Sequence, residues 1–540
     1  MTIEFQLQHH RKRTRSAAES LSSDQILEWL TVSGYYPEAY VLPPSFAVHR
    51  TPNPPQRFIV MPSGKLNGEL KDSDPPIIHF PKTRYSDRAF SIVDPIIHND
   101  ISHVISQHWS EIVGTTLSDS SRVVSYSFPI PLDRDNPGVI PSGRSRSSIY
   151  QFVSMIDQDI TAIAHKYKFM VRTDIKNFYP SIYTHSIPWA IHGKEEIRKG
   201  DNRYCMGFFG NQLDKLFQRM NDGRTNGIPI GPAVCDIAAE LIATAVDQCF
   251  TEYVSEDKRS WDFQAIRFKD DYRILVQSEG DGVELVKKLR DALSTYSLEL
   301  SDEKTEIVPI PLSMYRLWKT RYLAVYPQEG KVNKWKPFVA LYLNVLEIEK
   351  EVPGSGMIDR FLGDIVSGGS VLSSETLSEK RCHQLTSMLL MLGNLRLQSF
   401  PKVLAVLECL YKDSRIHPCR HVIVDALQHQ LQSLVTDIRR NRYQIIWICY
   451  FFASNGIGYD EEPTYRPSHG FSKPSKKDDD LILKSIATGS ANLFSANKYT
   501  KHFKLFESPK KAGKRTTLLE HVSVYPTEPK LVRSSGLSGS

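Results

Sequence analysis

Two adjacent acidic residues, Asp270 and Asp271, stand between two short apolar runs at residues 264–266 and 274–276. This pattern predicts a β-hairpin with both carboxylates at its tip, although Asp-Asp pairs are also common in solvated surface turns. Farther upstream, a predicted buried strand ends on a third acid, Asp174. Carboxylates from two neighbouring strands can hold two Mg²⁺ ions that activate a hydroxyl and neutralise a transferred phosphate. The three acids therefore predict two-metal phosphoryl transfer.

Two further segments add to this pattern. One lies between Asp174 and Asp270, and the other follows Asp271. Residues 226–233 form a Gly/Pro-rich turn that leads into a long helix, for which Pro232 suits the first position. Small alanine side chains give this helix a slim profile, which would let a nucleobase pair approach it closely. Residues 298–305 follow the predicted hairpin and contain Lys304. The order of Asp174, turn and helix, acidic pair, and lysine is that of motifs A, B, C and D of a polymerase palm.

Over roughly residues 81 to 305 the chain resembles the reverse transcriptases. Asp174 matches the carboxylate of motif A, residues 268–271 (Phe-Lys-Asp-Asp) match the aromatic-x-Asp-Asp of motif C, and Lys304 matches the lysine of motif D. Lys269 departs from the Ala or Met of retroviral-type enzymes, and Ile230 and Pro232 replace the Gln and Ser usual in motif B. These departures leave the behaviour toward the template open.

The resemblance implies a role for each matching residue. Two Mg²⁺ ions, with Mn²⁺ as an alternative, would be held by Asp174, Ile175, Asp270 and Asp271. Lys304 would protonate the leaving pyrophosphate, unless it is an ordinary exposed lysine. The ring of Tyr179 would exclude a ribose 2′-hydroxyl and so select deoxynucleotides, although core packing is the simpler explanation for one ring of the Phe178-Tyr179 pair.

The triphosphate and the nucleic acid need cations as well. Residues 81–92 resemble the fingers hairpin of the family, where Arg88 is the first candidate for phosphate binding and Lys82 and Arg84 are the next. Gly231 is expected beside the nucleotide. Contacts with the nucleic-acid backbone are expected from Arg144, Arg146 and Lys269.

The helical C-terminal half points to one branch of the family, since this combination resembles the bacterial abortive-infection and "unknown group" reverse transcriptases, including AbiK-like proteins. The resemblance implies antiphage defence, dNTPs, an RNA that could be noncoding, a DNA product and a homo-oligomer. Synthesis could copy RNA or be untemplated and protein-primed, and the priming tyrosine is unknown. The alternatives are an RNA-dependent RNA polymerase and a catalytically silent nucleic-acid-binding scaffold with a palm fold.

Length and pattern predict an α+β region followed by a helical one. The resemblance implies that these are reverse-transcriptase fingers and palm followed by an α-helical repeat-like domain. Four C-terminal helices are expected at about 381–397, 402–412, 420–438 and 442–453. The expected divisions of the 540 residues are an N-terminal extension (1–75), fingers and palm (76–348), a helical thumb or repeat-like domain (349–455), and a partly mobile tail (456–540).

Composition sets broader limits. The net charge of +6 permits a polyanionic partner without requiring one. The seven cysteines form no CxxC pair, which favours a reducing compartment. The longest apolar run, residues 445–453, is too short to span a bilayer, and no signal peptide is recognised. A cytoplasmic protein without membrane contact is therefore expected.

Overall fold

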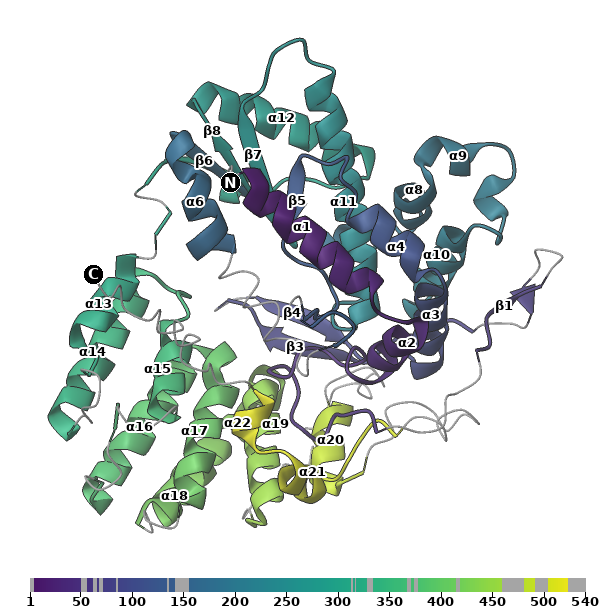
Figure 1. Cartoon of the computed structure of the whole chain (residues 1–540). Coiled ribbons are helices and arrows are strands. Elements are labelled where there is room, and N and C mark those ends of the chain that lie inside the picture. Colours follow the sequence, from purple (N-terminus) through teal and green to yellow (C-terminus); the bar gives the residue numbers. More distant parts are fainter. Residues whose placement is uncertain are drawn as a thin grey trace.

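A sheet-containing region of mixed helices and strands leads into a row of helices in this computed structural model (Figure 1). The structure describes residues 4–49, 56–61, 66–67, 71–83, 86–133, 136–140, 155–311, 314–315, 317–327, 334–366, 371–372, 377–413, 418–458, 480–490 and 504–522. The predicted α+β class with a helical C-terminal region is confirmed.

The centre of the first region is a five-stranded sheet in the order β5-β7-β8-β6-β9. β6 pairs antiparallel with β8 and β9, β7 pairs antiparallel with β8, and β5 pairs parallel with β7. Since side chains alternate across a strand, the sheet contributes to two hydrophobic clusters, one containing Ala265 and Ile274 and the other Ile266 and Leu275. The strands are β5 Val123–Ser125, β6 Phe169–Asp174, β7 Phe263–Phe268, β8 Asp271–Val276 and β9 Glu306–Pro309.

Helix α11 (Ala233–Ser255) is the long helix predicted after the Gly/Pro turn, and it packs against α12 (Glu279–Thr295). Pro232 is its N-cap, so the helix begins one residue later than the sequence suggested. Gly231 has φ +138°, and a Cβ there would lie 3.0 Å from the Pro37 Cγ and 3.2 Å from the Ser91 carbonyl oxygen. Glycine is therefore required at this turn for both conformation and space.

The segment expected to form the fingers hairpin is a β-hairpin of β3 (Ile77–Pro81) and β4 (Asp87–Ser91), paired antiparallel. The Ser91 N–H donates to the Ile230 carbonyl at 2.8 Å, which joins the hairpin to the turn before α11. The first region also contains α1 Glu4–Glu19, α2 Ser23–Val32, β1 Ile59–Val60, β2 Leu66–Asn67, α3 Pro95–Gln107, α4 Trp109–Thr116, η1 Met155–Ile160, α6 Thr161–Ile163, α7 Phe178–Ser181, α8 Ser186–His192, α9 Lys194–Arg198, α10 Phe209–Met220 and η4 Asp302–Lys304.

The second region is a row of helices beginning at Leu317 (Figure 1). The four helices expected from the sequence correspond to α16, α17, α18 and α19, with α19 beginning four residues before the expected position. The row consists of α13 Leu317–Val325, α14 Trp335–Glu351, α15 Met357–Val366, α16 Glu379–Leu395, α17 Phe400–Lys412, α18 Pro418–Leu434, α19 Ile438–Asn455 and α20 Asp480–Thr488.

A disulfide joins Cys382 in α16 to Cys419 in α18. The expectation that the cysteines are reduced is therefore wrong for this pair. The sequence did not indicate the disulfide, because its cysteines are 37 positions apart and do not form a CxxC motif. The apolar run at 445–453 lies inside α19 and is almost entirely buried. Among the described helices, none combines the length and apolarity needed to cross a bilayer.

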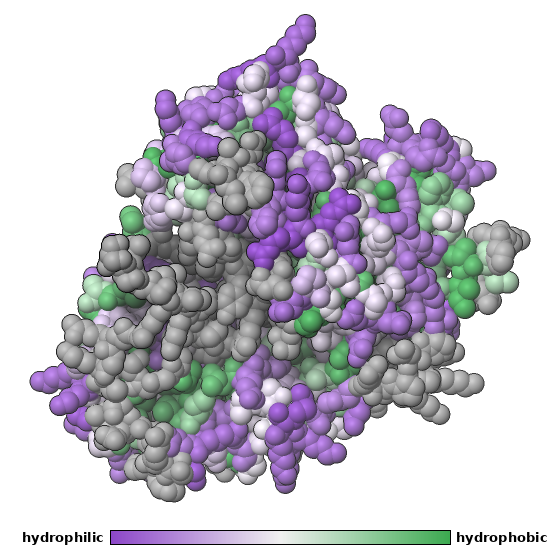
Figure 2. Space-filling view, viewed as in Figure 1, coloured by the Kyte–Doolittle hydropathy of each residue, from purple (hydrophilic) through white to green (hydrophobic). Residues whose placement is uncertain are grey.

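The segment at residues 504–522 joins the helical row to the N-terminal segment. It contains α21 (Pro509–Arg515) and α22 (Leu518–His521). Tyr36 donates its hydroxyl to the Leu505 carbonyl at 2.6 Å, and the Leu518 N–H donates to Glu408 of α17 at 2.7 Å. On the face shown in Figure 2, hydrophilic residues cover most of the described surface, and hydrophobic residues form separate small patches.

Candidate active site

Strand register brings the three predicted acids to one edge of the sheet. Asp174 is the last residue of β6 and lies directly opposite Asp271, the first residue of β8. Directly opposed residues in antiparallel strands have Cα atoms about 4.5–5.5 Å apart. Asp270 occupies the intervening turn, and its carbonyl accepts the N–H of Ile175 at 3.1 Å. Four residues named from the sequence as metal ligands thus meet at this edge.

The turn between β7 and β8 is held in an unusual conformation at Lys269, whose φ is +56°. The Lys269 N–H donates to the Ser127 hydroxyl at 2.8 Å, and the Lys269 carbonyl accepts from the Arg267 guanidinium at 3.1 Å. The Lys269 ammonium lies 3.9 Å from the Glu38 carboxylate. Fixing both backbone groups of Lys269 fixes the start of the acidic pair that follows it.

Crowding of the carboxylates disfavours their ionisation. Burial and the Asp174 carboxylate raise the pKa of Asp270, while Lys269 and Arg88 oppose the shift. Asp271 is exposed to solvent on one side, yet protein atoms around its carboxyl group and the adjacent Asp270 raise its pKa to about 6. Cations placed among these groups would relieve the repulsion.

Lys304 supplies one such cation. It lies in the short helix η4, and its ammonium donates to the Asp174 Oδ2. That hydrogen bond raises the pKa of Lys304, so its ammonium form is stabilised. The lysine predicted from motif D therefore lies beside the carboxylate predicted from motif A.

The oxygen donors at this edge fit a hard divalent cation. Asp174 is buried, and within the described residues its Oδ1 has no hydrogen-bond partner. A buried carboxylate oxygen without a partner is costly, and a metal ion would satisfy it. No group of three or more His, Cys, Asp or Glu side chains is already arranged as a metal cluster in the described part of the chain.

Two of the predicted phosphate-binding cations, Arg88 and Lys82, lie in or beside the β3–β4 hairpin. Arg88 belongs to β4 and is close enough to lower the pKa of Asp270. Lys82 is exposed at the hairpin tip, where its carbonyl accepts from Gln398 of the helical row at 2.9 Å. Arg84, Arg144 and Arg146 lie outside the described residues.

Tyr179 lies one turn beyond β6, in helix α7. Its hydroxyl donates to the Asp236 Oδ1 at 2.5 Å, and its carbonyl accepts the Ile228 N–H at 3.0 Å. The same stretch of chain contains Gly231, immediately before α11. Tyr179 is therefore joined to the motif B segment by both its side chain and its backbone.

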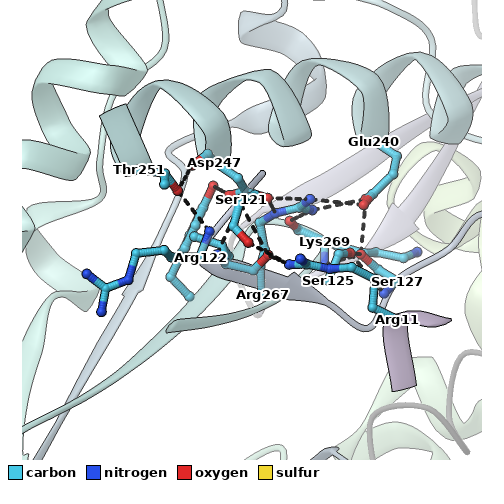
Figure 3. A network of polar contacts seen from close by, with 12 residues as sticks. Arg11, Ser121, Arg122, Ser125, Ser127, Glu240, Asp247, Thr251, Arg267 and Lys269 are labelled. Atoms are coloured by element: carbon cyan, nitrogen blue, oxygen red, sulfur yellow. Dashed lines mark hydrogen bonds and ion pairs between the residues drawn. The ribbon is translucent and has the colours of Figure 1, made fainter. Parts of the chain in front are cut away.

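A buried ionic network behind the turn was not anticipated from the sequence (Figure 3). Arg267 is fully buried and donates to Glu240 and Asp247 of α11 at 2.9 Å. Ser127 donates to Glu240 at 3.1 Å and accepts from Lys269, so the network extends to the acidic turn. Burial alone would lower the pKa of Arg267, but the two carboxylates raise it well above its ordinary value.

The family comparison agrees with this geometry. Residues 130–327, which contain all three acids and Lys304, match the family model "Reverse transcriptase (RNA-dependent DNA polymerase)". These residues form a reverse transcriptase domain. Such a domain is that of an RNA-directed DNA polymerase, a nucleotidyltransferase.

Two solved structures match the chain at low sequence identity. Apo telomerase from Candida tropicalis is 12% identical, with 72% of this chain and 69% of that chain covered and a TM-score of 0.31. Telomerase from Candida albicans in complex with the TWJ fragment of telomeric RNA is also 12% identical, with 73% and 66% covered and a TM-score of 0.29. The search of curated proteins finds no match. The assignment therefore rests on the family match and the site geometry.

Proposed function

We propose that this reverse transcriptase domain adds deoxynucleotides to a primer hydroxyl at the edge formed by Asp174, Asp270 and Asp271. The observation that carries the proposal is the in-register pairing of Asp174 with Asp271, with Asp270 in the adjoining turn. These side chains, with the Ile175 carbonyl, would hold two Mg²⁺ ions or, alternatively, Mn²⁺. The ions would lower the pKa of the attacking hydroxyl and neutralise charge on the phosphate.

The surrounding side chains have proposed roles that follow from their positions. Lys304, already an ammonium donor beside Asp174, would give its proton to the leaving pyrophosphate. Arg88 and Lys82 on the fingers hairpin would bind the triphosphate, together with Arg84. Lys269 would contact nucleic acid after exchanging its distant Glu38 partner for a phosphate. Arg144 and Arg146 are proposed to contact the same backbone.

Sugar selection is assigned to Tyr179, whose ring would occupy the volume of a ribose 2′-hydroxyl. Gly231, in the turn before α11, would lie beside the nucleotide. A side chain at this position would also meet Pro37 and Ser91. Deoxynucleotides are the proposed substrates. Preference for rNTPs over dNTPs would identify the chain as an RNA-dependent RNA polymerase instead.

Incorporation of labelled dNTPs by the purified chain, with Mg²⁺ and with or without co-purified RNA, tests the proposal. The Asp270→Ala/Asp271→Ala variant should lose incorporation, and Asp291→Ala, which removes an exposed acid of α12, should keep it. Equal background signal from the wild type and the double variant would overturn the enzymatic proposal and favour a silent scaffold.

We further propose that the enzyme acts in the cytoplasm in antiphage defence as a homo-oligomer, with an RNA that could be noncoding. Support comes from the resemblance to abortive-infection and AbiK-like enzymes and from the helical row that follows the palm. Phage plating on cells that express the wild type or the double Asp variant tests this role. The candidate tail tyrosines, Tyr459, Tyr465, Tyr499 and Tyr525, lie outside the described residues. DNA that stays attached after denaturation would show protein priming.

A further inference from the structure

The ring of Tyr179, proposed above to exclude a ribose 2′-hydroxyl, is held by a contact that the sequence did not suggest. We call this ring the sugar gate. The Tyr179 hydroxyl donates to the Asp236 Oδ1 at 2.5 Å, and Asp236 lies in the first turn of α11. Hydrogen bonds to an ionised acceptor are about twice as strong as neutral ones. This bond therefore ties the tip of the ring to the motif B helix.

The ring of Tyr179 packs against the hydrophobic core, but packing beside it is incomplete. A cavity of about 20 Å³, enough for one water molecule, lies there and is partly open to solvent. The cavity is lined by Tyr179 and Asp236 and extends to Ser127, Glu240 and Lys269. This space is too small to receive the ring. The position of the ring depends on the hydrogen bond as well as on its contact with Phe178, whose ring centroid is 5.6 Å away.

We propose that Asp236 is a positioning residue for sugar selection, acting through Tyr179. By holding the hydroxyl, Asp236 keeps the ring where a 2′-hydroxyl would lie, and loss of this hydrogen bond lets the ring shift and admits ribonucleotides. This inference rests on the proposed function, because it assumes that the site binds nucleoside triphosphates. It assigns a role in sugar selection to Asp236 of α11, in addition to Tyr179.

Four substitutions test the hydrogen bond between Tyr179 and Asp236 separately from the bulk of the Tyr179 ring. Asp236→Ala removes the acceptor, Tyr179→Phe removes the donor while keeping the ring, and Asp236→Asn keeps an acceptor oxygen of the same size. Glu252→Ala, which changes an exposed acid of the same helix, is the matched control. If the two groups act through one bond, the double variant Asp236→Ala/Tyr179→Phe should resemble each single variant.

The first measurement is the ratio of kcat/KM for dATP to that for ATP. Asp236→Ala and Tyr179→Phe should each lower the ratio about tenfold, as expected for loss of a hydrogen bond to a charged group. Asp236→Asn should recover most of it, and Glu252→Ala should equal the wild type. A purely structural role would lower both kcat/KM values together and leave the ratio unchanged, which would overturn the proposal.

The second measurement is equilibrium binding of dATP and ATP with Ca²⁺ in place of Mg²⁺, which needs no turnover. Preference for dATP in the wild type, reduced in Asp236→Ala, would support the proposed role of Asp236 even if no variant incorporated nucleotides, and only the proposed chemistry would then fail. Equal binding of the two nucleotides by the wild type would overturn the proposed role of Asp236. So would an Asp236→Ala variant that keeps the wild-type preference in both measurements.

Discussion

At the scale of single residues, neighbouring charges set the chemistry of this site. Asp270 and Asp271 are adjacent in the chain and meet Asp174 across the sheet, so each carboxylate makes ionisation of the next less favourable. The Lys304 ammonium, which donates a hydrogen bond to Asp174, offsets part of the negative charge of that carboxylate. The proposed metal site would bind divalent cations more strongly at neutral pH than in acid.

The raised pKa of Asp271, about 6, predicts how metal binding depends on pH. Above that pH the carboxylate is ionised and available, and below it a proton competes with the metal. The apparent affinity for Mn²⁺ should therefore fall by up to about tenfold per pH unit below 6. Titrations of Mn²⁺ followed by electron paramagnetic resonance at pH 7.5, 6 and 5 measure this. Asp271→Asn should bind more weakly and with a shallower pH dependence, and an equally steep dependence in that variant would contradict the assignment.

Lys304 offers a second prediction at this scale. Lys304→Met removes the proposed proton donor and should slow single-nucleotide incorporation by about 100-fold or more. Binding of dATP should change much less, because the fingers cations remain. Lys287→Met, on the exposed face of α12, removes a lysine whose pair with Glu284 is solvated and should leave the rate unchanged. A large loss of dATP affinity with an unchanged rate would place Lys304 in binding rather than in proton transfer.

At the scale of elements, sequence pattern located the hairpin, the strand that ends at Asp174 and the helices of the C-terminal row, since each has a local signal. The turn at Lys269 depends on contacts that no local pattern specifies, such as Ser127 and Glu38. A weak signal for the buried network did exist. Arg267 interrupts an apolar strand, and Glu240 and Asp247 lie two turns apart on an alanine-rich helix. Only the packed structure shows that these charges pair.

The network predicts a large effect on stability from one substitution. Arg267→Met leaves Glu240 and Asp247 buried without their cation, which should lower the free energy of unfolding by about 3–5 kcal/mol. Arg259→Met removes an arginine of similar chemistry from a surface pair with Asp281 and should cost about 0–1 kcal/mol. Urea denaturation followed by circular dichroism compares the two. Similar losses would mean that the buried carboxylates find other partners.

At the scale of the whole molecule, the segment at 504–522 connects the N-terminal segment to the helical row. His521 donates its Nε2–H to the Leu42 carbonyl at 2.8 Å, and its ring lies beside Trp447 of α19. Burial lowers the pKa of His521 from 6.5 to about 4, so the imidazole is neutral in the folded protein. This junction should therefore be sensitive to acid.

The sign of that sensitivity follows from proton linkage. Between pH 6.5 and 4 the unfolded chain binds a proton at His521 that the folded chain does not, so stability is lost as the pH falls. The loss between pH 7 and 5 should be at most about 2 kcal/mol from this group. Thermal unfolding of the wild type and of His521→Gln at both pH values measures it. The variant should lose less on acidification than the wild type, whereas His9→Gln at an exposed position should match the wild type.

The contact between Tyr36 and Leu505 joins residues separated by 469 positions. The ribosome adds Tyr36 long before Leu505, so the segment that contains Pro37 and Glu38 lacks this contact until Leu505 has been synthesised. The site can acquire its final surroundings only after the helical row and residues 504–522 have emerged. A nascent chain is therefore expected to stay inactive until residues 504–522 have emerged from the ribosome.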